Sequence, residues 1–128
     1  MRKIVIQTIP HAEQRHDSPR DCWLNGDTLE LRVSQLQDEL YETALAVHAL
    51  MESLLVLAHG VDMERVDEWK RGYAEFRSTS LVHLPEDAGD HPAAPYHHEH
   101  VFARNRERDF LHEAGGNWLD YERALAQL

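Results

Sequence analysis

The chain is short of cysteine, of basic charge and of long apolar runs, and each shortage excludes a class of protein. A single cysteine, Cys22, can form no disulfide within the chain and cannot supply a zinc site of several thiolates. Thirteen basic against twenty-three acidic residues leave a net charge of −10, so we expect no nucleic-acid partner. No apolar run is predicted to span a bilayer and the first residues show no signal-peptide pattern. We therefore expect a cytoplasmic location and no membrane partner.

The chain does contain enough apolar sequence for one domain and an unusual number of histidines. Its 128 residues are 42% hydrophobic and 28% charged, which suits a single folded domain over residues 1–128. It holds no glycine-rich phosphate loop and no nucleophile elbow. Ten histidines stand beside the acidic excess. Histidine and carboxylate chemistry is therefore the first place to look for function.

Residues 1–34 are predicted to be rich in β-structure. Ile4–Ile9 has the composition of a strand, and Asn25-Gly26 between two strand-like runs predicts a two-residue hairpin. Alternate apolar residues follow the turn, which is typical of a strand with one buried face: Leu29, Leu31 and Val33. We expect a small antiparallel sheet of two or three strands, which needs helices to cover its apolar side.

Residues 35–128 are predicted to be helical apart from a long loop over residues 78–95, so the expected fold class is α+β with the sheet packed against three or four helices. Ser34 or Asp38 is placed to cap the first helix. The first expected helix ends near His59, and the second runs over residues 62–77. The third runs from Pro95 or Tyr96 to the glycines at 115–116, and the fourth runs over residues 118–127. A loop as long as 78–95 in a small domain is typical of a mobile or functional segment.

The first expected helix carries a histidine and a glutamate among apolar residues. On a helical wheel His48 and Glu52 lie one turn apart with apolar positions on both sides. The predicted solvent-facing arc is elsewhere and consists of Glu39, Glu42, Ala46, Ala49 and Ser53. His48 and Glu52 are therefore expected to point into the protein.

The helix that begins near Tyr96 repeats this pattern. His100 and Glu107 fall in the middle of its apolar stripe. Burying a charged carboxylate without a partner is very costly, so the negative charges of the acids that the two helices direct inward must be balanced. A metal ion, a histidine–carboxylate network or a water-filled pocket could each do so.

The functional interpretation is a divalent-metal site. His48, Glu52 and His100 are ligands that suit zinc, iron, manganese or nickel, and they leave room for a water that the metal activates, as in a small metallohydrolase. Asp67 is expected as a further metal ligand, because in a hairpin of the first two helices it lies about as far from the turn as Glu52. Glu107 is expected as a fourth ligand, as a partner that orients a ligand, or as a catalytic general base.

The alternative is a protein without enzymatic activity that binds a host protein. In that case the same histidines and acids form a buried network that fixes how the helices pack. The two interpretations differ in partner: a small-molecule substrate in the first, a host protein in the second. The aromatic residues of the last helix leave a homodimer open.

Three stretches of the chain match a recurring pattern. They are Tyr41-Glu42, Ala46-Val47-His48-Ala49-Leu50-Met51-Glu52 and Ala94-Pro95-Tyr96-His97-His98-Glu99-His100. This pattern resembles small, mostly uncharacterised proteins of bacteriophages and prophages. The family pattern has His-Glu where this chain has His48-Ala49. The resemblance implies a phage or prophage origin, with the host cytoplasm as location, and implies no particular activity.

Overall fold

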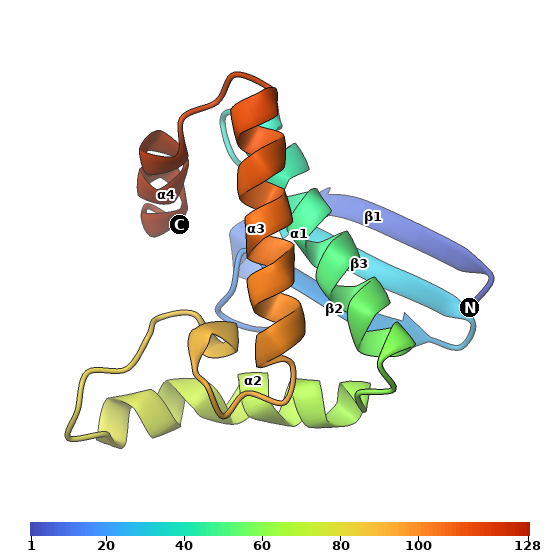
Figure 1. Cartoon of the computed structure of the whole chain (residues 1–128), viewed down its shortest axis with the longest axis vertical. Coiled ribbons are helices and arrows are strands. Elements are labelled where there is room, and N and C mark those ends of the chain that lie inside the picture. Colours follow the sequence, from blue (N-terminus) through green and yellow to red (C-terminus); the bar gives the residue numbers. More distant parts are fainter.

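A computed structural model describes all residues, 1–128, and shows one mixed sheet packed against four helices (Figure 1). The strands are β1 (Lys3–Ile9), β2 (Arg20–Asn25) and β3 (Thr28–Ser34), and the helices are α1 (Glu39–Ala58), α2 (Met63–Thr79), α3 (His97–Glu113) and α4 (Trp118–Ala126). Two short 3-10 turns, η1 (His11–Glu13) and η2 (Ala88–Asp90), lie between them. The expected α+β class is confirmed.

The sheet has the strand order β1-β3-β2, and its pairing differs in one respect from the expected antiparallel sheet. β2 and β3 form the predicted antiparallel hairpin, but β1 pairs with β3 in parallel, from Lys3 opposite Thr28 to Ile9 opposite Ser34. The most apolar strand takes the centre: Leu29, Leu31 and Val33 of β3 are almost completely buried. Since the chain reverses twice between β1 and β3, a central β3 necessarily runs parallel to β1.

The hairpin turn lies one residue further along than the sequence predicts. Asn25 pairs with Thr28, so the two loop residues are Gly26 and Asp27. Gly26 has a φ of 62°, and no residue other than glycine has a positive φ. Glycine alone at the first loop position is what a type II′ turn requires.

The helix caps follow the sequence closely. Asp38, Asp62 and Asn117 each accept a hydrogen bond from a backbone N–H in the first turn of the helix that they precede. Ser34 is the last residue of β3, which leaves Asp38 as the cap of α1.

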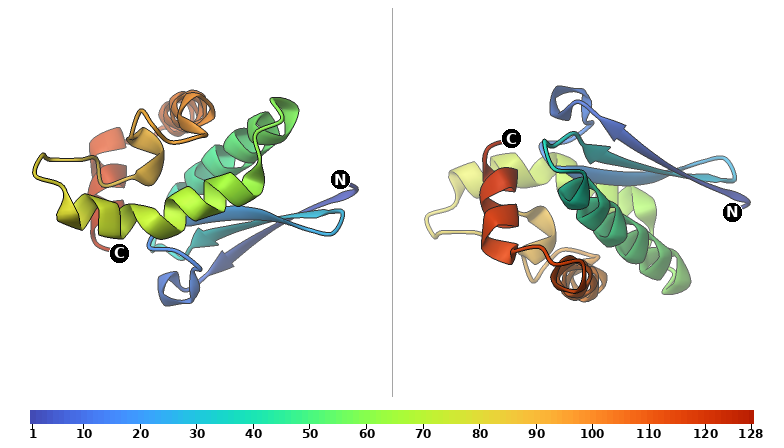
Figure 2. Two further views of the ribbon diagram at one scale, coloured as in Figure 1. Left: turned by 90° about the horizontal axis from the view of Figure 1, so that it is seen from below. Right: turned by 90° about the horizontal axis from the view of Figure 1, so that it is seen from above.

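The helices lie on one side of the sheet (Figure 2), with α1 against β2 and β3 and α3 against α1. By length and composition alone α1 could cross a membrane; here it is the central helix, between the sheet and α3. The predicted solvent arc of α1 is wrong at Ala49 and Ser53, which are 3% and 0% exposed. Ala49 packs against Cys22 and Leu29 of the sheet, because small side chains let the helix approach closely. His48 and Glu52, next to Ala49 and Ser53 in the chain, are buried as well, and His48 contacts Glu107 of α3.

Candidate metal centre

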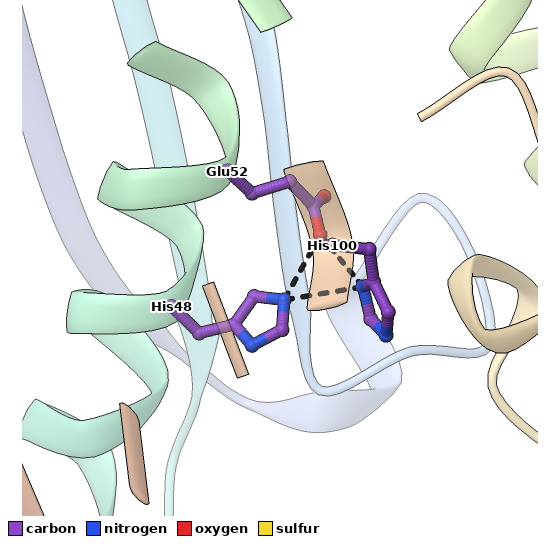
Figure 3. Close-up of side chains that lie close together, drawn as sticks. All are labelled: His48, Glu52 and His100. Atoms are coloured by element: carbon purple, nitrogen blue, oxygen red, sulfur yellow. Dashed lines mark hydrogen bonds and ion pairs between the residues drawn. The ribbon is translucent and has the colours of Figure 1, made fainter. Parts of the chain in front are cut away.

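Three of the predicted ligands come together between α1 and α3. His48 and Glu52 extend from adjacent turns of α1, and His100 extends toward them from the first turn of α3 (Figure 3). Their exposed fractions are 0%, 5% and 1%, so all three belong to the interior. The structure therefore brings together the His48, Glu52 and His100 that sequence periodicity directs inward.

The donor atoms of these residues form a small triangle. Glu52 Oε2 lies 2.9 Å from His48 Nε2 and 2.7 Å from His100 Nδ1, and the two nitrogens are 3.2 Å apart. Donors that share one divalent ion at about 2.0–2.2 Å are themselves separated by roughly 2.9–3.4 Å. The triangle thus has nearly the size of one face of a coordination polyhedron.

The proton on one ring nitrogen of His48, Nδ1, determines whether the other nitrogen, Nε2, has a lone pair free for a metal ion. Nδ1 lies 2.8 Å from Glu107 Oε1, and the Tyr121 hydroxyl donates to the other oxygen of Glu107. Burial raises the pKa of Glu107, but the hydrogen bond with His48 and the charge of Arg20 lower it more, so the carboxyl is ionised. An ionised carboxylate only accepts, so Nδ1 carries the proton and Nε2 can present its lone pair to the triangle.

His100 is held in the same way from its far side. Its Nε2 lies 3.2 Å from Asp90, which also pairs with Arg104, and 3.6 Å from Asp87. Burial lowers the pKa of His100, but the hydrogen bonds with Asp90 and Glu52 raise it to about 9. Arg104 Nη2 also lies 3.0 Å from Nε2 of His100. A metal ion at the triangle would replace the proton of Nδ1 and leave the ring proton on Nε2, which faces Asp90.

Two imidazole nitrogens and a carboxylate oxygen therefore converge on one point. Burial raises the pKa of Glu52, but hydrogen bonds with His100 and His48 lower it to well below its usual value. If neither nitrogen carried a proton, three electron-rich atoms would face one another at 2.7–3.2 Å. Such an arrangement needs a cation between the atoms, and either protons or a metal ion can supply it.

The triangle borders a cleft of about 980 Å³. Glu52 and His100 line it together with Arg20, Lys70 and Tyr96. Protein donors thus approach the central point from α1 and α3, and the cleft lies against two of the three residues; His48 is not part of its lining.

Asp67 does not join this triangle. It lies beside His16 and Asp21, and Arg15 donates to both carboxylates, at 2.6 Å to Asp21 and 3.2 Å to Asp67. The expected hairpin of the first two helices does not form, because α2 runs at a wide angle to α1 (Figure 1) instead of back along it. A guanidinium already balances the charge of Asp67 where it lies.

Glu107 is near the triangle but not in it. It contacts the nitrogen of His48 that faces away from Glu52 and His100, and it does not line the cleft. Of the three roles expected for Glu107, its contacts match the one in which it orients a ligand.

Sequence reasoning missed Asp87, Asp90 and Lys70. The two aspartates come from the predicted loop, where no periodicity indicates the direction of a side chain; their signal was the acidic loop directly preceding the helix of His100. Asp87, Asp90 and His100 also form a second group of possible donors, but Arg20 and Arg104 already pair with its carboxylates. No family model, curated protein or solved structure matches this chain. The geometry of the site therefore carries the functional argument.

Proposed function

We propose that this protein binds one divalent metal ion through His48, Glu52 and His100 and acts as a small metallohydrolase. The observation that carries the proposal is the triangle of donor atoms, with edges of 2.7, 2.9 and 3.2 Å, at the border of a cleft. Two imidazoles and one carboxylate form the ligand set of several zinc hydrolases. The same set suits iron, manganese and nickel.

The hydrolytic activity follows from the open side of the site. A divalent ion lowers the pKa of a bound water to near 7 and so supplies hydroxide at neutral pH. A carboxylate faces the outer nitrogen of each histidine, Glu107 at 2.8 Å from His48 and Asp90 at 3.2 Å from His100, and would orient the imidazoles for ligation. Tyr96, edge-on to His100 at a ring distance of 6.0 Å, also lines the cleft. The substrate and the phage origin stay predictions.

A second candidate is a structural network of the same residues in a protein that binds a host protein. The observation that favours it is the raised pKa of His100, since a protonated His100 can donate to Glu52 without any metal. The two candidates differ in metal content and not in fold.

Elemental analysis of protein made without a histidine tag tests the proposal. We expect about one divalent ion per chain in the wild type, close to none in His48→Ala, and an unchanged content in His98→Ala, whose side chain is exposed. Glu52→Gln keeps the shape of the ligand and should also lose the metal, so a folding defect of His48→Ala would not obscure the result. Circular dichroism reports whether each variant is folded. Equal metal content in all four proteins, or none in the wild type, would refute the proposed site.

A further inference from the structure

An ammonium group without a hydrogen-bonding partner lies beside the donor triangle. Lys70 extends from α2 so that its Nζ is 4.0 Å from Glu52 Oε1, the oxygen that neither histidine uses. Its side chain is only 11% exposed. The Tyr96 ring lies 5.3 Å from Nζ and can offer a cation–π contact but no acceptor oxygen.

This position leaves the donors of the ammonium free for a ligand in the cleft. An ammonium carries three donors, and removing them from water without acceptors is unfavourable. Lys70 makes no protein hydrogen bond, and its nearest acid is beyond hydrogen-bonding distance. Lys70, Glu52 and His100 line the same cleft. An acceptor arriving through the cleft could therefore reach Nζ and the metal position together.

The charges around the site also favour an incoming anion. Four carboxylates lie against the two histidines: Glu52, Asp87, Asp90 and Glu107. The permanent cations that contact these carboxylates are Arg20, Lys70 and Arg104. These groups carry four negative and three positive charges. A divalent ion added to them leaves one net positive charge, which a bound monoanion would balance.

We propose that Lys70 and the metal ion of the proposed function together form a binding site for an oxyanion, a phosphate or carboxylate group of the substrate. The inference rests on that function, because the metal supplies one of the two contacts. The anion would place one oxygen on the metal ion, beside the bound water in an expanded coordination, and another against Nζ of Lys70. The substrate class is then an anionic small molecule that carries a phosphate or carboxylate next to the bond to be cleaved.

Titration of the cobalt-loaded protein with inorganic phosphate and, separately, with acetate tests this inference. Visible absorption of bound Co²⁺ reports both metal binding and entry of an anion. We expect at least one anion to change the spectrum of the wild type. The anion that binds more tightly shows whether the substrate group is a phosphate or a carboxylate. Lys70→Met keeps the apolar stem and should weaken anion binding at least tenfold. It should bind cobalt at least as tightly, because it removes a positive charge 4.0 Å from a ligand carboxylate.

The neighbouring Arg71→Met is the matched control, because Arg71 also lines the cleft but is exposed and forms no ion pair. It should bind cobalt and anion like the wild type. If cobalt binds but neither anion affects its spectrum, or if Lys70→Met binds anions as well as the wild type, this inference fails and the proposed function stands. If cobalt does not bind to the wild type at all, both fail.

Discussion

The two ring nitrogens of His48 face two different carboxylates, and the two acids therefore have different roles. Glu107 meets Nδ1 at 2.8 Å and Glu52 meets Nε2 at 2.9 Å. Only one of the two can accept a proton from a neutral imidazole. The hydroxyl of Tyr121 keeps Glu107 in place, so Glu107 accepts the proton of His48 Nδ1. Glu52 faces the unprotonated Nε2 and therefore needs a cation between the two atoms.

Glu107→Gln tests this division of roles. The amide oxygen can still accept from His48, but the negative charge that strengthens the imidazole as a ligand is lost. Metal affinity should fall by about 10- to 100-fold, the usual effect of changing a group that orients a ligand. Isothermal titration calorimetry with zinc measures this directly.

Glu113→Gln, an exposed position on the same helix, is the control and should bind zinc like the wild type. A Glu107→Gln variant that loses stability while keeping full zinc affinity would show that Glu107 serves only the fold. Complete loss of metal in a folded variant would instead indicate direct ligation.

The residues that the sequence placed correctly are those whose direction a helix determines. His48, Glu52, His100 and Glu107 are all buried, as the 3.6-residue period predicts. Asp67 depended on the angle between α1 and α2, which no local pattern encodes. Lys70 was missed because long charged side chains usually lie in solvent, and burial of one becomes visible only when the packing is known.

At the scale of elements, the short turn η2 decides how closely the loop can approach α3. A Cβ added at Gly89 would lie 2.5 Å from ring atoms of His100. The absence of a side chain there lets η2 pack on the imidazole and brings Asp90 to its outer nitrogen. The loop predicted over residues 78–95 thus forms one wall of the site.

Gly89→Ala is therefore expected to displace the His100 ring and to lower zinc affinity by tenfold or more, while the helix content stays unchanged. Gly72→Ala is the matched control, because Gly72 lies within α2 and a Cβ there meets nothing within 4 Å. Alanine in a helix should stabilise that variant by roughly 0.5–1 kcal/mol without affecting zinc. Calorimetry and thermal unfolding measure the two effects. Unchanged zinc binding in Gly89→Ala would mean that the ring position is not critical.

Local signals also explain which elements could be predicted. Asp38, Asp62 and Asn117 marked three helix starts because a cap is a property of a few adjacent residues. The parallel pairing of β1 and the burial of Ala49 follow from contacts between distant segments. No local pattern indicates the pairing of β1. The burial of Ala49 could not be predicted because an alanine suits a solvent-facing arc and a close helix–sheet contact equally well.

Over the whole molecule, buried charges link stability to pH in two opposite directions. For Glu52, Glu107, Asp87 and Asp90, burial raises the pKa but hydrogen bonds and nearby cations lower it more, so their net pKa lies below the usual range. The stability that they contribute is present above pH about 4 and is lost as the pH falls below it. His100 behaves oppositely: its pKa rises from 6.5 to about 9 despite burial, through Asp90 and Glu52. Its contribution is present below pH about 6.5 and is lost as the pH rises toward 9.

The metal-free protein should therefore be most stable between about pH 5 and 6.5 and should lose stability toward pH 8.5. Zinc competes with the proton on His100, so the stabilisation by zinc should grow over the same range and nearly vanish at pH 5. Thermal unfolding with a chelator and with saturating zinc, in steps from pH 5 to 8.5, measures both trends. His98→Ala should reproduce them, because its ring is exposed and lies outside the triangle. A zinc-induced rise in melting temperature that is the same at pH 5 and pH 8 would contradict ligation by imidazole.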